Sequence, residues 1–323
     1  MIEQNRTSTQ QLPSELIATV ASQCRNAVSE DFLTLSEALI DRFGPSLDAV
    51  ILYGSCLHSC SLDEGIADLY AVVDNYRDAY SQHHLALLNA WLPPNVFYLE
   101  VSKQGKTLRA KYAVISLADF EKGARDWFHP YIWARFAQPA RILYVRDEAN
   151  QQRMYEAIAH AVVTFLRSSI EALGPVEANV EEIWASGLML TYAAELRTEQ
   201  KTRARHLAQS NLDDYTQLTT TARSALAGIL EALPNGHYQC LPSTADRRRA
   251  LRRWRLRRWQ GRILSILRLT KATITFRDCL DYAAWKIERH TGVHVEITPM
   301  LRRHPVLWGY KVMWQLLRRG VLR

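Results

Sequence analysis

Two short apolar runs decide the fold: DAVILYGS at residues 48–55 and ADLYAVVD at residues 67–74. The first run is rich in Val, Ile and Tyr and ends in Gly54-Ser55, which is typical of a buried strand that meets a tight turn. Twelve residues separate Ser55 from Asp68 in the second run. The pattern predicts two neighbouring strands, with a glycine turn on one and a carboxylate on the other.

Strand and helix signals alternate on either side of these two runs. Further strands are expected at NVFYLEVS, TLRAKYAVIS and ARILYV, which are residues 95–102, 107–116 and 140–145. Helical patterns lie between them, at LALLNAWL and DFEKGARDWF. The alternation predicts an α/β or α+β domain, and with the helical pattern that follows we expect the α+β class.

We divide the chain into four regions by these changes in pattern. A helical lead-in covers residues 1–30, and the α+β domain covers residues 31–147. Apolar residues then recur at helical spacing, which predicts a mainly helical domain over residues 148–235. A basic region follows at residues 236–323.

The composition places the chain among globular proteins. Of its 323 residues, 48 % are hydrophobic, 10 % are aromatic and 23 % are charged, which excludes the collagen-like and wholly disordered classes. No run of 18 apolar residues is present, the five cysteines form no CxxC pair, and residues 1–20 resemble neither a secretion signal nor a transit peptide. We therefore expect a protein of a reducing compartment, the cytoplasm.

A basic C-terminal region follows an acidic body. Residues 246–323 contain 20 Lys and Arg against 5 Asp and Glu, a net charge of +15. Because the whole chain has 40 basic and 33 acidic residues, the other residues hold 20 and 28, a net charge of −8. This split predicts a polyanionic partner, either an anionic membrane surface or nucleic acid.

Two stretches of the basic region have the pattern of interfacial helices. In residues 246–268 and again in residues 305–319, apolar side chains recur on one helical face among arginines. Four side chains are expected to enter the membrane interface: Trp254, Trp259, Ile263 and Trp314. Arginine with interleaved tryptophan also suits nucleic acid. Because these tryptophans share a face with aliphatic residues, nucleic acid is the less favoured partner.

The Gly54-Ser55 turn and Asp68 predict a site for a phosphorylated ligand. Glycine has no Cβ, so the backbone can approach phosphate closely, and N–H groups with the Ser55 hydroxyl can bond to its oxygens. A carboxylate on the next strand would hold Mg²⁺ against those oxygens, because Mg²⁺ takes one or two carboxylates plus phosphates and waters. Glu100, on the third strand, would complete a metal pair or be a solvated strand residue. Alone, the pattern also fits an ordinary strand turn and an edge aspartate.

Residues 111–145, from KYAVIS to ARILYV, carry a resemblance to a known family. With YGSCL and DLYAVVD before them, they resemble the mitochondrial-type phosphatidate cytidylyltransferases, the translocator assembly and maintenance family of the DNA polymerase beta nucleotidyltransferase superfamily. The resemblance extends more weakly to residues 261–291. Ala113 and Ala134 stand where the family has glycine, and Tyr70 stands where the superfamily has a second carboxylate.

The resemblance implies a nucleotidyltransferase-fold mixed sheet, a winged-helix-like second domain and a membrane-associating C-terminal segment. It implies the reaction of CTP with phosphatidic acid to give CDP-diacylglycerol and pyrophosphate, with Mg²⁺ as cofactor. Tyr53, Gly54 and Ser55 would bind the triphosphate. Asp68 would hold the metal, and Lys111 and Arg135 would neutralise phosphates. Such an enzyme would lie on the cytoplasmic face of a bacterial inner membrane, or on the matrix face of the mitochondrial inner membrane in a eukaryote.

Two alternatives remain open at this point. A nucleotidyltransferase with another acceptor needs the same turn and the same Asp68, because those residues handle only the triphosphate. A catalytically inactive, membrane-docking nucleotide-binding adaptor is suggested by Tyr70, which leaves the expected second carboxylate absent.

Overall fold

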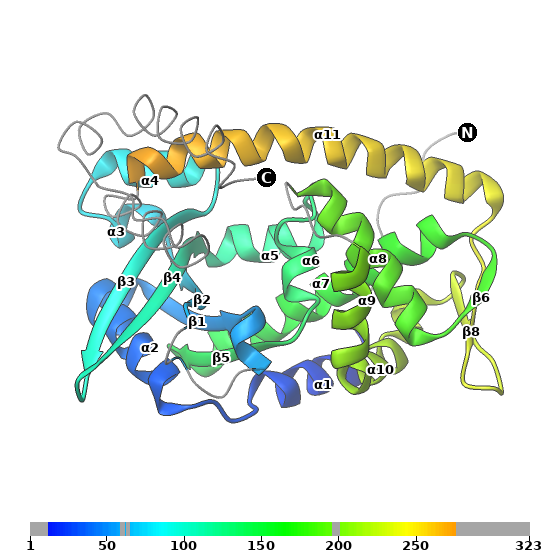
Figure 1. The fold of residues 1–323 in the computed structure, drawn as a ribbon, viewed down its shortest axis with the longest axis horizontal. Coiled ribbons are helices and arrows are strands. Elements are labelled where there is room, and N and C mark those ends of the chain that lie inside the picture. The colour runs from blue at the N-terminus through cyan, green and yellow to red at the C-terminus, as the bar shows by residue number, and fades with distance from the viewer. Residues whose placement is uncertain (1–11, 59–61, 63–64, 196–200, 276–323) are drawn as a thin grey trace, which may run out of the picture.

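The computed structural model of the chain describes residues 12–58, 62, 65–195 and 201–275. Figure 1 shows a central sheet with helices around it and one long helix, α11, that runs along one side of the body. No helix within the described ranges is long and apolar enough to cross a membrane.

The central sheet has five strands and is mixed, as the family resemblance implied. The strands are β1 (Leu47–Tyr53), β2 (Ala67–Val73), β3 (Asn95–Lys103), β4 (Lys106–Ser116) and β5 (Ala140–Val145). Their order is β3-β4-β2-β1-β5, with β2 and β4 parallel and the other pairs antiparallel. The α+β fold class is therefore confirmed.

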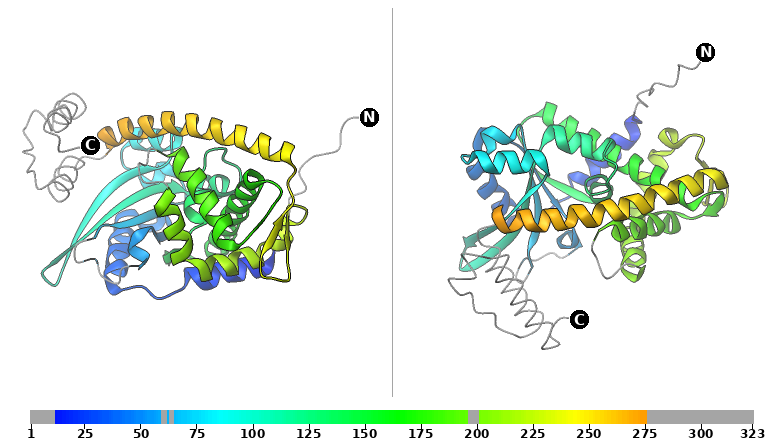
Figure 2. Two further views of the ribbon diagram at one scale, coloured as in Figure 1. Left: turned by 45° about the vertical axis from the view of Figure 1, so that its right-hand side comes forward. Right: turned by 90° about the horizontal axis from the view of Figure 1, so that it is seen from above.

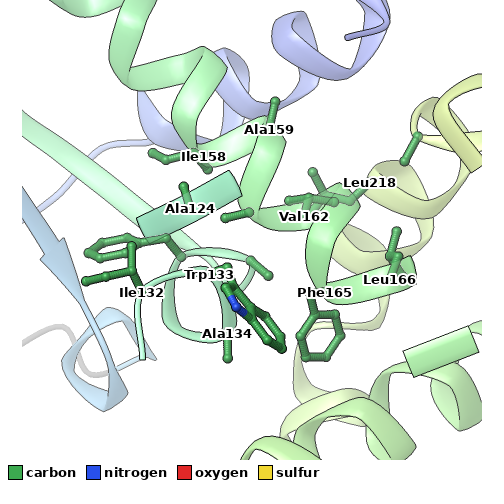
Figure 3. Packing of buried hydrophobic residues seen from close by; sticks show 14 of the residues in the cluster. Ala124, Ile132, Trp133, Ala134, Ile158, Ala159, Val162, Phe165, Leu166 and Leu218 are labelled. Carbon is green, nitrogen blue, oxygen red and sulfur yellow. The ribbon is translucent and has the colours of Figure 1, made fainter. Parts of the chain in front are cut away.

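Helices cover both faces of this sheet. On one face, apolar residues of α2 (Glu30–Phe43) pack against the inward side chains of the strands. On the other face lie α5 (Leu117–Arg125), α6 (Trp133–Phe136) and the 26-residue α7 (Glu148–Leu173). Figure 3 shows this second core, in which Trp133 lies close to Phe165 of α7.

The remaining elements surround these layers. The helices are α1 (Ser14–Cys24), α3 (Tyr76–Ala79), α4 (His83–Trp91), α8 (Val180–Ala194), α9 (Lys201–Ser210) and α10 (Leu212–Thr221). The single turns of 3-10 helix are η1 (Gly44–Ser46), η2 (Ser55–His58) and η3 (Arg223–Leu226). A second, three-stranded sheet has the order β6-β8-β7 and consists of β6 (Val176–Ala178), β7 (Leu230–Ala232) and β8 (Tyr238–Cys240).

The basic helix α11 (Thr244–Thr275) packs along the body instead of standing apart from it. It contacts α7 and α8 in its first part and β3 near its end, and both views in Figure 2 show it lying against the other elements. The Trp254 indole donates a hydrogen bond to the Ser168 carbonyl on α7, at 3.3 Å. The Lys271 ammonium donates to the carbonyls of Leu92 and Pro94, between α4 and β3. The first half of the predicted basic region is thus part of the fold.

Candidate functional site

Gly54 and Asp68 meet at one end of β1 and β2. Tyr53, the last residue of β1, is paired with Asp68 near the start of β2. Gly54 then turns the chain with a φ of +87°, a conformation that costs glycine little. A Cβ on Gly54 would lie 3.2 Å from the Asp68 carboxylate. The structure therefore confirms that the predicted turn and the predicted carboxylate lie next to each other.

Lys111 lies beside Asp68 because β2 and β4 run parallel and in register. The two residues are directly paired across the strands. The Lys111 Nζ is 3.6 Å from Asp68 Oδ1, and both side chains are about one-third exposed. Both side chains therefore contact solvent. The phosphates of a bound ligand could replace Asp68 as the partner of the Lys111 ammonium.

Arg135 approaches the same place from α6 and is held by aromatic rings. Its Nη1 donates a 2.9 Å hydrogen bond to the Tyr70 hydroxyl. Its guanidinium carbon lies 5.3 Å from the Tyr53 ring centroid and 4.3 Å from that of Tyr131. Burial raises the pKa of the Tyr70 phenol well above its ordinary value, so Tyr70 is a neutral acceptor. The position of the expected second carboxylate is thus occupied by Tyr70, whose hydroxyl holds the Arg135 guanidinium.

The charge of Arg135 is retained although the side chain is only 13 % exposed. Burial on its own would lower the pKa of the guanidinium, but the surrounding tyrosine oxygens and Glu195 raise it well above its ordinary value. The Glu195 carboxylate lies 3.7 Å from Arg135 Nη2. The protein therefore presents a fixed, protonated arginine at this position.

Gly54, Asp68, Arg135 and Glu195 line a cavity of about 150 Å³ between the sheet and the helices; Lys111 is not part of the lining and reaches the site through its contact with Asp68. The sheet and its neighbouring turn and helix contribute Tyr53, Gly54, Leu57, Asp68, Ala134, Arg135, Gln138 and Pro139. The opposite wall, from α8 to the start of α10, contributes Thr191, Tyr192, Glu195, Arg203, Leu207 and Asn211. Ligand pockets for whole drug-sized molecules measure roughly 300–1,000 Å³, so the cavity itself matches a part of a nucleotide, such as its phosphates.

The helical wall supplies two charged side chains and an asparagine that the sequence did not single out. Glu195 follows α8, Arg203 lies on α9, and Asn211 precedes α10. No motif marks any of them, because they lie more than 120 residues after Asp68 and reach the cavity only through the packing of α8 and α9. A search for charged residues close to the turn in sequence would not have found them.

The prediction that Glu100 shares a metal with Asp68 is wrong in this structure. Glu100 is on β3 and Asp68 on β2, with β4 between them. Neighbouring strands are roughly 4.8 Å apart, so two intervals separate the backbones by about 10 Å. The Glu100 carboxylate instead accepts hydrogen bonds from the Tyr98 hydroxyl and from Arg109, at 2.6 and 3.1 Å.

Asp68 is therefore the predicted metal ligand that remains. Within the described ranges, no cluster of three His, Cys, Asp or Glu side chains has the geometry of a metal centre. A Mg²⁺ ion bound through one carboxylate, phosphate oxygens and waters needs no such cluster. Gly54 has no Cβ to crowd the Asp68 carboxylate, so Asp68 is the residue that would hold a Mg²⁺ ion arriving with a nucleotide. The Ser55 hydroxyl, the other predicted phosphate ligand, lies outside the described side chains.

The predicted membrane residues fall into three classes. Trp254 was wrongly predicted, because its side chain is 1 % exposed and packs against Trp133 with ring centroids 5.9 Å apart. Trp259 and Ile263 lie on the outer face of α11 and are 66 % and 39 % exposed. Trp314 lies outside the described residues.

Comparison with known proteins gives a distant structural likeness. No model of a known protein family matches the chain, and no curated protein does. Among solved structures, the chain is similar to a nucleotidyltransferase-like protein from Exiguobacterium sibiricum 255-15, with 10 % sequence identity and a TM-score of 0.26. The likeness covers 91 % of this chain and 93 % of the other. At this TM-score it adds nothing to the argument from the geometry of the cavity.

Proposed function

We propose that the chain is a nucleotidyltransferase that uses CTP and Mg²⁺, and that its acceptor is phosphatidic acid in a membrane surface. An oxygen of the lipid phosphate would attack the α-phosphorus of CTP. The bond from that phosphorus to the β-phosphate oxygen would break, and pyrophosphate would leave. The products are CDP-diacylglycerol and pyrophosphate.

The contact between Gly54 and the Asp68 carboxylate carries this proposal. A strand that ends in a glycine turn against a carboxylate on the adjacent strand brings backbone N–H groups and a metal ligand to the same phosphate oxygens. Mg²⁺, when bound, neutralises charge on the triphosphate. Asp68 would orient the ion, and the turn would hold the phosphates in line.

The charges around the cavity support an anionic ligand. Lys111 and Arg135 lie beside the two carboxylates, Asp68 and Glu195, and Arg203 adds a further positive charge to the lining. Phosphoryl and nucleotidyl transfer depend mainly on positioning and on neutralising charge at the phosphorus. Arg135, fixed by aromatic rings and Glu195, is suited to that role.

The choice of a lipid acceptor rests on the outer face of α11. Exposed apolar side chains, Trp259 and Ile263 among them, lie with exposed arginines along that face. Such a helix binds an interface through its apolar side chains and anionic lipid through its arginines. An enzyme whose substrate is a bilayer lipid needs such a docking surface.

Turnover of CTP tests the proposal. The full chain, incubated with radiolabelled CTP, Mg²⁺ and phosphatidic acid vesicles, should form labelled CDP-diacylglycerol. Asp68→Asn should lower the rate roughly a hundredfold or more, because it removes the charge that holds the metal. Glu100→Gln is the matched control and should retain the rate, since Glu100 is two strands away. Absence of labelled lipid from folded, vesicle-bound protein would refute the proposed acceptor.

A second function is favoured by Tyr70. Because its hydroxyl anchors Arg135, the cavity offers one carboxylate at the usual position of two, which suits an inactive nucleotide-binding adaptor. CTP binding without turnover on any acceptor, in equilibrium measurements with Mg²⁺, would favour this reading. Transfer to a protein, a nucleotide or another lipid would favour a different acceptor.

A further inference from the structure

Tyr131 links the cavity to α11. The ring of Tyr131 has two guanidinium groups against it: that of Arg135, 4.3 Å from its centroid, and that of Arg268, 3.8 Å away. Arg135 comes from α6 and lines the cavity, whereas Arg268 comes from the last turns of α11. One aromatic ring therefore lies between Arg135 of the site and Arg268 of a helix, which is 133 residues later in the sequence.

Arg268 is half-buried between α11 and the body of the protein. Its Nε is inaccessible to solvent and has no hydrogen-bond partner among the residues that the structure describes. Burial lowers the pKa of its guanidinium. The face of an aromatic ring partly compensates a desolvated guanidinium, and arginine suits this stacking better than lysine. The Arg268 Nη2 also donates a long, 3.5 Å hydrogen bond to the Pro93 carbonyl, so the Tyr131 ring and this carbonyl are the contacts that hold the side chain.

The position of Tyr131 in turn restricts Arg135. If the ring moved, the guanidinium of Arg135 would lose one of the surfaces that confine it. Its other contacts include the Tyr70 hydroxyl, the Tyr53 ring and Glu195. Two like charges against one ring also repel each other, so Arg268 disfavours movement of Arg135 toward α11.

We propose that Tyr131 and Arg268 are positioning residues that hold the Arg135 guanidinium at the cavity, so that α11 forms part of the nucleotide site. This inference rests on the proposed function for its effect on nucleotide binding. The arrangement of the three side chains is a property of the fold alone, and it can be tested without any nucleotide.

Nucleotide affinity gives the first test. In the full chain, Arg268→Leu should weaken binding of Mg²⁺–CTP roughly tenfold, and Tyr131→Leu should do the same, whereas Tyr131→Phe keeps the ring and should restore most of the affinity. In an Arg135→Lys background, Arg268→Leu should add less than about a twofold loss, because it acts through Arg135. Losses that multiply in the double variant would overturn the proposal.

Arg257→Leu is the matched control. Arg257 also lies on α11 against aromatic rings, 4.6 Å from the Trp254 centroid, and donates a 2.8 Å hydrogen bond to the Phe128 carbonyl. It should perturb the packing of α11 as much as Arg268→Leu does, yet leave CTP affinity within about twofold. An equal loss of affinity in both variants would mean that α11 has only a structural role.

Side-chain NMR gives the second test and needs no ligand. The Nε–H resonance of Arg135, assigned by its disappearance in Arg135→Lys, should shift in Arg268→Leu and in Tyr131→Leu and stay in place in Arg257→Leu. A shift without any CTP binding by the unaltered chain would support the positioning arrangement and refute the proposed function. An unmoved resonance in all three variants would overturn the positioning role even if CTP binds.

Discussion

Trp254 and Trp259 lie five residues apart on α11, yet the first is 1 % exposed and the second is 66 % exposed. Five residues turn an α-helix by about 140°, so the two indoles point to different sides. The inner one packs on Trp133 and bonds to the Ser168 carbonyl, while the outer one lies among exposed arginines. A helix rich in Arg and Trp thus uses the same residue types as core on one face and as surface on the other.

Arginine shows the same division along α11. On the inner face, Arg257 and Arg268 stack on aromatic rings, and burial lowers the pKa of each guanidinium, to about 10 for Arg257. On the outer side, Arg252 and Arg255 are exposed. The positive charge of this region is therefore not all available to a partner, because part of it belongs to the packing.

Among substitutions that test the two faces of α11, Trp254→Ala is expected to lower the unfolding free energy most. Removal of a buried tryptophan costs about 3–5 kcal/mol of unfolding free energy, because both the transfer of the side chain and the cavity contribute. Urea unfolding of the full chain measures the loss. Trp259→Ala, the matched substitution on the outer face, should change the unfolding free energy by less than about 0.5 kcal/mol. Equal losses in the two variants would contradict the division between the faces.

Gly261→Ala should separate α11 from the helix beneath it. A Cβ on Gly261 would lie 1.9 Å from the Ala194 carbonyl oxygen and 2.8 Å from the His129 ring, which the backbone cannot accommodate without moving. We expect a loss of about 1–3 kcal/mol in unfolding free energy, as for other overpacked sites. Alanine is otherwise the better helix former by about 1 kcal/mol, so a gain in thermal stability would show that α11 does not pack here.

Lys271 should make the attachment of the end of α11 depend on pH. Burial, aided by the charge of Arg268, lowers the pKa of its ammonium to about 7, against an ordinary value near 10.5 in an unfolded chain. Between these values the unfolded chain binds a proton that the folded chain has released, so stability rises with pH. From pH 7 to 9 the unfolding free energy should increase by about 1 kcal/mol per pH unit relative to Lys271→Met, measured by urea unfolding. If the unfolding free energy of the unaltered chain and of Lys271→Met changed equally with pH, the prediction would be contradicted.

The sequence was informative where the chain itself brings residues together. Gly54 and Asp68 belong to adjacent strands of a short segment, so apolar pattern and spacing were enough to predict that they meet. The pairing of Lys111 with Asp68 depends on parallel register between β2 and β4, which the pattern of neither strand specifies. Lys111 was found through a family resemblance instead.

The sequence did not predict the positions of residues that reach the site or the core through the packing of distant elements. Glu195 and Arg203 reach the cavity through α8 and α9 and carry no motif. The helical period on α11 correctly placed Trp259 on the same face as Ile263. It could not show that Trp254, on the opposite side, packs into the hydrophobic core of the body. Glu100 was misplaced for a similar reason, because alternation along β3 gives its face and not the number of strands between it and Asp68.

The smallest expected effect concerns the outer face and the membrane. Trp259→Ala should leave the fold intact and weaken binding of the full chain to anionic vesicles roughly fivefold, because one interfacial apolar contact is lost while the arginines remain. Vesicle sedimentation at two salt concentrations measures this, and the arginine contribution should fall at high salt because the Debye length shortens to about 3 Å at 1 M. Point substitutions serve better here than deletion of α11, which would also remove Trp254 from the core. Unchanged vesicle binding in Trp259→Ala, or a preference of the unaltered chain for RNA over anionic vesicles at matched salt, would show that the outer face of α11 has another partner.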